Sequence, residues 1–479
     1  MPISRRRMLG LVAAGGALFQ AAWTRAQSVT GYYRLMQGPM IGAVGPDRVS
    51  FHLRASAPVP VAIEYGLHPE LVDARLSPAV QTSVEGDYTA HLTLTDLSPD
   101  TTYYYRPILA GVRDRYLDER PPFRFRTAPM PGSKGRLRIA FGSCARIQAH
   151  PVQPIWDAVV QWQPDLFLWL GDNVYHDTLE PRIMDEMYRW QRGVPNLQPL
   201  LRGVPNLAIW DDHDYALNDQ DRTNPAKDAA LASFRKHWAN PAGGLPDVTG
   251  VFFEFTYGAV DFFMLDGRWH RDPADQADGP GKTMLGAGQL QWRKRRLMAS
   301  KATFKLIACG SGWSSAKGPS GDAWSAYLHE RDALFDFIRD EGITGVVLLS
   351  GDTHVGELNA IARSEQRGYD LYELVSSPLA QDTRTNWLER RPEMRIREVY
   401  VGDCNFGAIE IDTTLPDPEI RLNLIDTRGN RVWKPVVLKA SELANGRSTW
   451  RDRIDHDSLR RLEASRAGRD YYSPGGAPD

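Results

Sequence analysis

Short apolar stretches of this chain are each followed at once by side chains that can bind a metal ion or move a proton. The clearest stretch covers residues 165–170, is typical of a buried strand, and breaks at Gly171 just before Asp172 and Tyr175. Because aspartate is also a common helix cap, Asp172 alone does not define a site. The same arrangement recurs along the chain, and the polar endings are Cys144, Asp172, Asp211-Asp212-His213-Asp214, Asp266 to Arg268, Ser311, and Asp352 with His354.

These polar endings are expected to meet in space. The ends of neighbouring strands lie at one rim of a sheet core, which is where α/β folds bind ligands. Carboxylates, a phenol, a thiol and an imidazole gathered there would repel one another or remain unsatisfied without a counter-charge. A bound metal ion supplies that charge. The sequence therefore predicts a metal site at one rim of the sheet core.

The motifs that carry these residues resemble a known family. They are Phe141-Gly142-Ser143-Cys144, Gly171-Asp172-x-x-Tyr175, Trp210-Asp211-Asp212-His213-Asp214 and Gly351-Asp352-Thr353-His354. Their joint occurrence in this order resembles the alkaline phosphatase D (PhoD-like) family of the calcineurin-like metallophosphoesterases. Further similarity lies in Asp266-Gly267-Arg268 with Arg271, Met284-Leu285-Gly286-x-x-Gln289, and Asn405-Phe406-Gly407. The resemblance extends over nearly the whole chain.

The resemblance implies an αββα sandwich, two sheets flanked by helices, with metals at one sheet edge. It implies that a first metal, Fe³⁺, is bound by Cys144, Asp172, Tyr175 and His354. Thiolate and phenolate ligands suit such an ion because both anions stabilise a high positive charge. The implied second metal is Ca²⁺, bound by the oxygen ligands that it prefers, which here are Asp172 as the bridge, Asp212 and Asp352. Mn²⁺ and Zn²⁺ are the alternatives.

The implied reaction is hydrolysis of a phosphoester by a metal-bound hydroxide, since a bound metal lowers the pKa of water to about 7. His213 is expected to be the general acid, with Asp214 orienting its imidazole. A metal-ligand role or a purely structural role is the alternative for His213. Arg146 and Arg268 are expected to grip the phosphate, with a surface salt bridge as the alternative for each.

Residues 136–440 are expected to form the phosphatase domain that positions these side chains. A strand at 137–141, a helix at 154–161 and the strand at 165–170 make a βαβ unit. Later strands are expected at 207–210, 260–265, 305–310 and 345–350, and two more, near 371–374 and 408–411, are expected to close a second sheet. Residues 441–479 are expected to be a polar helical segment with a disordered tail, and this segment could cover the site as a lid.

The region before the phosphatase domain has a different pattern. Residues 29–128 consist of short alternating strands and turns, which predict an antiparallel β-sandwich. Residues 97–105 resemble the tyrosine-corner region of fibronectin type III domains, in which a tyrosine bonds back to the turn backbone. His52 and His91 lie in this module and are expected to be structural or solvated. Residues 129–135, which are rich in proline and glycine, are the linker.

The first residues predict export. Residues 1–26 combine consecutive arginines with a short apolar run, which is typical of a twin-arginine signal peptide. A general secretory signal that happens to contain arginines is the alternative. The twin-arginine machinery moves folded proteins, so it suits a protein that takes up metal before export. The expected destination is the periplasm or the extracellular space.

The bulk composition limits the other possibilities. A chain of 479 residues exceeds one ordinary core, so two or more domains are expected. The formal net charge of −2 gives no electrostatic case for binding nucleic acid or an anionic membrane. Three cysteines allow one disulfide bond at most. We expect a monomer with no stable membrane anchor. Its expected partners are the twin-arginine export machinery and the phosphoester substrate.

Taken together, the sequence predicts an exported metal-dependent phosphoesterase. The alternative is a non-catalytic protein that binds a surface polymer and carries a decayed phosphatase domain, but the complete ligand set argues against it. The natural substrate, the choice between monoesters and diesters, and the roles of Asp211, Asn173 and Arg271 are left open by the sequence.

Overall fold

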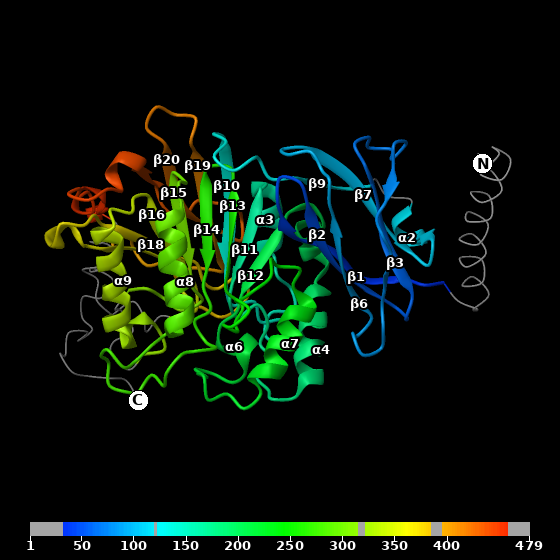
Figure 1. Ribbon diagram of the computed structural model, residues 1–479, viewed down its shortest axis with the longest axis horizontal. Coiled ribbons are helices and arrows are strands. Elements are labelled where there is room, and N and C mark those ends of the chain that lie inside the picture. The colour runs from blue at the N-terminus through cyan, green and yellow to red at the C-terminus, as the bar shows by residue number, and fades with distance from the viewer. Residues whose placement is uncertain (1–31, 119–121, 315–320, 385–394, 458–479) are drawn as a thin grey trace, which may run out of the picture.

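The computed structural model describes residues 32–118, 122–314, 321–384 and 395–457. The predicted signal peptide and the last part of the predicted C-terminal segment, residues 458–479, lie outside the described residues. The described part of the chain contains no helix that is both long and apolar enough to cross a lipid bilayer. The architecture is a mixed α/β fold built on four sheets (Figure 1).

Two antiparallel sheets form the N-terminal part, on the right of Figure 1. One has the strand order β1-β2-β6, and the other has the order β4-β3-β7-β8 with β5 beside β3 and β9 beside β7. Their bounds are β1 (Leu35–Val44), β2 (Val49–Ala55), β3 (Pro60–Gly66), β4 (Arg75–Leu76), β5 (Val80–Gln81), β6 (Thr89–Leu94), β7 (Thr102–Leu109), β8 (Val112–Arg113) and β9 (Phe123–Arg126), with the short helix α2 (Arg115–Asp118) between β8 and β9. Residues alternate between buried and exposed along β6, as expected for a half-buried strand.

The two N-terminal sheets enclose an aromatic core. The centroid of the Phe51 ring lies 4.9 Å from that of the Tyr105 ring and 5.6 Å from that of the Phe125 ring. The hydroxyl of Tyr103 accepts a hydrogen bond from the backbone N–H of Ser98 at 2.9 Å. This tyrosine therefore bonds back to the turn that precedes its strand.

Two six-stranded sheets form the rest of the molecule. The first has the order β12-β11-β10-β19-β20-β21, and its strands are β10 (Arg136–Gly142), β11 (Leu166–Leu170), β12 (Asn206–Ile209), β19 (Asn405–Asp412), β20 (Glu419–Asp426) and β21 (Val436–Lys439). The second has the order β13-β14-β15-β16-β18-β17, and its strands are β13 (Phe253–Tyr257), β14 (Val260–Met264), β15 (Phe304–Ala308), β16 (Val346–Ser350), β17 (Glu357–Ile361) and β18 (Leu371–Val375). β10, β11 and β12 run parallel in the first sheet, as do β14, β15 and β16 in the second.

Helices cover both outer faces of these sheets (Figure 1). Their bounds are α3 (Ile155–Trp162), α4 (Pro181–Arg192), α5 (Gln198–Gly203), α6 (Asp212–Tyr215), α7 (Lys227–His237), α8 (Gly286–Ala299) and α9 (Leu328–Asp340). Short 3₁₀ turns lie at η1 (Pro195–Leu197), η2 (Trp324–Ala326), η3 (Ser364–Gln366), η6 (Ala440–Glu442) and η7 (Arg451–Arg453).

Two hydrophobic clusters hold these layers together. Ile139 and Leu168 of the first sheet share one cluster with Ile307 and Leu348 of the second sheet, together with apolar residues of α8 and α9. Trp156 of α3 belongs to a separate cluster on the other face of the first sheet. Because strands buried on both faces must be apolar throughout, β11 and β16 are continuous hydrophobic runs.

Two predictions about the later elements are wrong in detail. The strands predicted near 371–374 and 408–411 do not close the same sheet, because β18 pairs with β16 and β19 pairs with β10. The described residues 441–457 contain only short helical turns, and not the continuous helix that their composition favours. This stretch is instead held by tertiary contacts, since Trp450 and Ile454 pack against the hydrophobic cluster between the central sheets.

Candidate metal centre

The candidate site lies at the lower edge of the molecule in Figure 1, where strands of both central sheets end near α6. Loops from the two sheets contact each other there. The amide of Asp352, which follows β16 of the second sheet, donates a hydrogen bond at 3.1 Å to Oγ of Ser143, which follows β10 of the first sheet. The strand ends therefore converge, although they come from two sheets.

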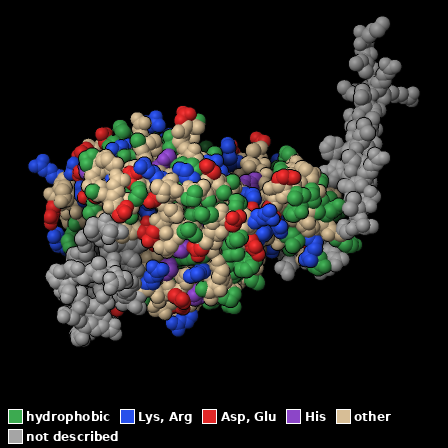
Figure 2. Space-filling view, turned by 90° about the horizontal axis from the view of Figure 1, so that it is seen from below, with side chains coloured by type: hydrophobic (Ala, Val, Ile, Leu, Met, Phe, Trp, Pro, Cys, Tyr) green, Lys and Arg blue, Asp and Glu red, His purple; other side chains and the backbone are tan. Residues whose placement is uncertain are grey.

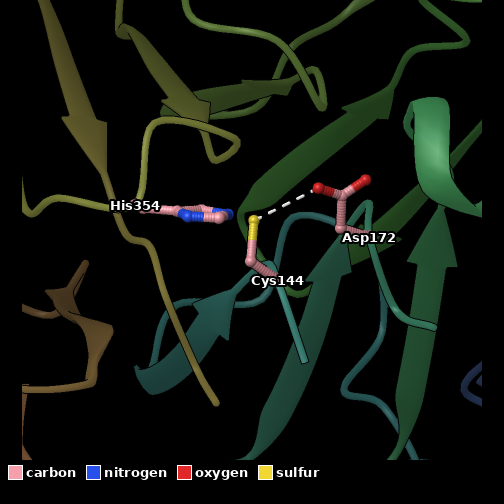
Figure 3. A group of neighbouring side chains, drawn as sticks. All are labelled: Cys144, Asp172 and His354. Atoms are coloured by element: carbon pink, nitrogen blue, oxygen red, sulfur yellow. Dashed lines mark hydrogen bonds between the residues drawn. The ribbon is translucent and has the colours of Figure 1, made fainter. Parts of the chain in front are cut away.

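Four predicted ligands of the first metal lie together at this edge. Cys144 Sγ lies 3.3 Å from Asp172 Oδ2, as the dashed line in Figure 3 marks. The Tyr175 hydroxyl lies 3.3 Å from the same Asp172 oxygen and 3.1 Å from His354 Nε2. Ligand atoms of Cys144, Asp172 and His354 all lie within 4.8 Å of one another, and the side chains are buried. One metal ion could contact all of these atoms.

The backbone is strained at the predicted ligands. The φ angles are +63° at Cys144, +50° at Asp172, +72° at Asp352 and +55° at His354, all in the left-handed region. Each such residue costs about 1–3 kcal/mol, and strain of this kind is concentrated at functional sites. The bent loops are held by backbone bonds, for example from Ala145 N to the carbonyl of Asp172 at 2.9 Å. The ligand side chains are therefore preorganised at the cost of local strain.

The electrostatics of this group favour a bound cation. Burial raises the pKa of the Cys144 thiol to about 11 and, together with Cys144, raises those of Asp172 and Tyr175 well above their ordinary values. Each anionic form is therefore disfavoured by burial and by the neighbouring donors. A metal ion would offset this cost, and a sulfur, phenol, carboxylate and imidazole set suits a transition metal.

A second group adjoins the first through Asp172. Ligand atoms of Asp172, Asp212 and His213 lie within 4.8 Å of one another, as do those of Asp212, Asp219 and Asp322. Asp212 Oδ2 accepts a hydrogen bond from the amide of Asp219 at 2.8 Å. This arrangement offers carboxylate oxygens to a second ion and leaves Asp172 between the two groups.

Asp352 and Asn173 lie close to these two groups of potential ligands but belong to neither group. The charge of Asp352 contributes to the raised pKa values of Cys144 and Asp211, yet Asp352 belongs to none of the potential ligand trios found among the described residues. Asn173 Nδ2 donates to the carbonyl of Ile209 at 2.9 Å, so the amide holds the loop. The Oδ1 atom of Asn173 is buried and has no hydrogen-bond partner within the described ranges, which leaves it available to an ion.

The predicted orientation of His213 by Asp214 is wrong. Asp214 Oδ1 accepts from the amides of Asn173 and Val174, at 3.1 and 3.3 Å, and its Oδ2 accepts from the amide of Asp211 at 3.2 Å. The carboxylate therefore faces backbone N–H groups, since it caps the turn that begins α6.

The carboxylate that contacts His213 is Asp177, which the sequence did not single out. Its Oδ1 lies 2.5 Å from His213 Nδ1. Burial lowers the pKa of His213, but the carboxylates of Asp172, Asp177 and Asp212 outweigh that effect and raise it to about 10. Asp177 follows Tyr175 by two positions in an irregular loop, and no sequence pattern distinguishes it from other loop aspartates.

Arg268, which was predicted to bind phosphate, is buried among carboxylates and does not line the cleft. Its side chain is completely buried and pairs with Asp211 at 2.5 Å, Asp322 at 2.5 Å and Asp212 at 3.5 Å. Its guanidinium is thus occupied by carboxylates behind the site. Arg271 is buried there too, where it pairs with Asp322 and donates to Ser311 Oγ at 2.7 Å. Asp211, whose role the sequence left open, is part of this ionic network.

A cleft of about 420 Å³ opens over the first metal group. Its lining residues are Arg146, Tyr175, Asp177, His213, Leu217, Asn218, His354, Gln381 and Arg384. The Arg146 guanidinium lies 5.3 Å from the centroid of the Tyr175 ring, and the Tyr175 and His213 ring centroids are 4.2 Å apart. Figure 2 views this edge from below and shows histidine and basic side chains near the middle of the face.

Arg146, one of the two arginines predicted to bind phosphate, lines this cleft. Its Nε is buried and has no hydrogen-bond partner in the described structure. Arg384 adds a second cation that the sequence did not single out, and its amide donates to the carbonyl of His354 at 3.1 Å. The cleft therefore presents two cations beside the candidate metal ligands.

The fold and the site together define a mixed α/β protein with a candidate two-metal centre where strands of its two central sheets end. Comparison with known proteins gives the family: the model of the PhoD-like phosphatase family matches residues 139–413, so the chain belongs to that family. Alkaline phosphatase D of Bacillus subtilis (strain 168) is 25% identical over an alignment of 318 residues, and the match covers 56% of this chain and 53% of the relative. The match thus spans about half of the length of this curated relative.

Two solved structures share the fold. A structure of PhoD is similar with a TM-score of 0.69 and 19% identity, covering 89% of this chain and 97% of that one. A purple acid phosphatase from yellow lupin (Lupinus luteus) seeds is similar with a TM-score of 0.61 and 13% identity, covering 87% of this chain and 75% of that one. The similarity in fold therefore extends well beyond the residues of the family match.

Proposed function

We propose that the protein is a metal-dependent phosphoesterase that hydrolyses phosphate monoesters, diesters or both. The observation that carries this proposal is the convergence of Cys144, Asp172, Tyr175 and His354 below a cleft that Arg146 lines. Buried anionic donors beside an open, basic cleft suit a metal that engages an anionic substrate. Membership of the PhoD-like phosphatase family supports the same reaction class.

The residues fit two metal ions of different character. Cys144, Asp172, Tyr175 and His354 would hold Fe³⁺, because thiolate and phenolate stabilise a high charge. Asp172, Asp212 and Asp352 would hold Ca²⁺ through oxygen atoms, and Asn173 Oδ1 is a further candidate. Mn²⁺ and Zn²⁺ are the alternatives. When bound, the metals supply Lewis acidity, which acidifies water and neutralises charge on the phosphoryl oxygens.

The side chains of the cleft perform the remaining tasks. Arg146 binds the phosphoryl oxygens, because its guanidinium is a charged donor group that lines the cleft. His213 donates a proton to the leaving oxygen, and Asp177 holds its imidazole through Nδ1. Arg268 does not contact the substrate but fixes Asp211 and Asp212 from behind. In this division of roles, Asp177 takes the place of Asp214 as the residue that orients His213. Of the two predicted arginines, only Arg146 remains in the cleft.

The experiment is hydrolysis of p-nitrophenyl phosphate and bis-p-nitrophenyl phosphate by the full chain, with metals analysed before and after chelation. We expect turnover that chelation abolishes and that metal restores, and the ratio of the two rates separates a monoesterase from a diesterase. The absence of turnover for both compounds in metal-replete protein would refute the proposal. That result would favour the non-catalytic, polymer-binding alternative, which the complete set of ligands otherwise disfavours.

We further propose that residues 29–128 form a fibronectin-III-like module, 129–135 a linker and 136–440 the phosphatase domain. The two antiparallel sheets and the bond from Ser98 N to the Tyr103 hydroxyl support the first assignment. We also propose that residues 1–26 direct the monomeric protein through the twin-arginine machinery to the periplasm or the extracellular space. Mass spectrometry of the exported protein would test this, because its mature N-terminus should follow the predicted signal.

A further inference from the structure

Three histidines meet where the N-terminal sheets contact the helices of the second part of the molecule. His52 of β2 and His91 of β6 lie opposite each other in the β1-β2-β6 sheet, with ring centroids 5.5 Å apart. His237, the last residue of α7, places its ring centroid 5.8 Å from that of His52. His52 and His237 are completely buried. The sequence predicts a structural or solvated role for His52 and His91 and assigns no role to His237, so their grouping is a product of the fold.

One of the contacts between the two sides constrains the protonation of His52. Arg192, the last residue of α4, places Nη1 3.2 Å from His52 Nδ1. A guanidinium has only N–H donors, so His52 Nδ1 must be the acceptor, and only the neutral imidazole has such an acceptor. Protonation would place an N–H of His52 against an N–H of Arg192. The interdomain bond therefore exists only while His52 is neutral.

None of the described side chains that act most strongly on His52 is a carboxylate. The charged and titratable groups that act on it are Arg192 of α4, His91 of β6, His237 of α7 and Arg54 of its own strand, and all four lower its pKa in addition to burial. The carboxylates nearby already have partners. Asp87 pairs with Arg54 at 3.0 Å and with Arg189 at 2.7 Å, and Asp185 pairs with Lys236 at 2.6 Å and accepts from His237 Nε2 at 3.2 Å.

We propose that this interface is a pH-sensitive latch, in which the N-terminal sheets dock onto α4 and α7 only while His52 is neutral. In the undocked chain His52 would titrate near its ordinary pKa of about 6.5, whereas in the docked state its pKa is far lower. The docking equilibrium is therefore fully favourable above about pH 6.5 and weakens about tenfold for each pH unit below that value. Between pH 7.5 and pH 5 this gives a loss of about thirtyfold from His52 alone.

The latch connects to the loops of the candidate metal centre. The Tyr188 ring of α4 stacks on His237 with a centroid distance of 4.7 Å, and its hydroxyl lies 3.4 Å from Asp214 Oδ1. Asp214 in turn accepts from the backbone of Asn173 and Asp211, which belong to two loops that carry predicted ligands. Opening of the latch should therefore loosen the metal loops. This second step rests on the proposed function, whereas the latch itself does not.

Hydrogen exchange of the full chain tests the latch without reference to activity. Protection factors, corrected for intrinsic exchange, are measured at pH 7.5 and pH 5 for peptides from β2, β6 and α4, with β14 to β16 as the internal reference. We expect the interface peptides of the wild type to lose about thirtyfold in protection while the reference peptides do not change. His52→Asn keeps an acceptor near Nδ1 and cannot be protonated, so its interface should remain protected at pH 5. His329→Asn, at an exposed histidine, is the matched control and should behave as the wild type.

Equal protection at both pH values in the wild type would overturn the latch, as would a loss at pH 5 in His52→Asn equal to that of the wild type. If His52→Asn does not fold, His52→Gln replaces it, and the wild-type comparison decides in either case. His52→Lys places a permanent cation at the interface, so it should open the latch at pH 7.5 and lower kcat/KM for bis-p-nitrophenyl phosphate at that pH. An open interface with unchanged kcat/KM would overturn the connection to the metal loops. Inactive wild-type protein would refute the proposed function while leaving the exchange test intact.

Discussion

Replacement of Asp177 by asparagine tests which carboxylate orients the proposed general acid. Asp177 Oδ1 lies 2.5 Å from His213 Nδ1, whereas the oxygens of Asp214 are occupied by backbone amides. A hydrogen bond to a charged group contributes about 1.5–3 kcal/mol. At about 1.4 kcal/mol per factor of ten, Asp177→Asn should lower kcat by about 10- to 100-fold if proton donation limits the reaction.

The dependence on the leaving group distinguishes this role from a merely structural one. Nitrophenolate needs little protonation as it leaves, whereas phenolate needs more. Asp177→Asn should therefore slow hydrolysis of diphenyl phosphate much more than that of bis-p-nitrophenyl phosphate. Removing Asp177 also lowers the pKa of His213, so the fall in kcat at alkaline pH should begin at a lower pH than in the wild type.

Asp214→Asn is the matched control, because it makes the same chemical change at the carboxylate that the sequence predicted to orient His213. Since Asp214 accepts from backbone amides of two metal loops, this variant should lose stability and bound metal without changing the ratio of the two rates. An unchanged rate with diphenyl phosphate in Asp177→Asn would refute the role of Asp177. A loss of metal from His213→Asn in proportion to its loss of activity would show that His213 is a ligand instead of an acid.

Four further substitutions test other parts of the site. Cys144→Ser should abolish a sulfur-to-iron charge-transfer absorption and lower the iron content, and an unchanged spectrum would refute the ligand assignment. Gly171→Ala should destabilise the fold by about 1–3 kcal/mol in denaturant titrations, because φ is +92° and a Cβ would lie 2.5 Å from Asp211 Cβ. Arg268→Met should cost about 3–5 kcal/mol in the same titrations, because it removes the cation that pairs with the buried carboxylate of Asp211, whereas a surface role would leave stability unchanged. Arg146→Ala should lower kcat/KM at least tenfold at constant metal content, and an unchanged kcat/KM would exclude a phosphate contact.

The local pattern of the chain was sufficient to locate the strand ends and most of the candidate ligands. The short apolar run of β11, broken at Gly171, favours a buried strand, and the loop that follows such a strand lies at a sheet edge. The sequence alone thus predicts one place for Cys144, Asp172, Tyr175 and His354, and the structure brings their side chains together. The resemblance of the motifs to a known family supplied the chemistry that such a group performs.

The tertiary structure decided which groups face one another, because that choice depends on long-range packing. Arg268 and Asp322 are 54 positions apart, and their ion pair removes Arg268 from the cleft. The grouping of His52, His91 and His237 likewise arises only when the N-terminal sheets dock onto α7. The distinction between Asp177 and Asp214 has the same origin. Asp214 follows His213 in the chain, and Asp177 lies in a neighbouring loop. The carboxylate of Asp214 caps a helical turn, whereas that of Asp177 is directed at the imidazole.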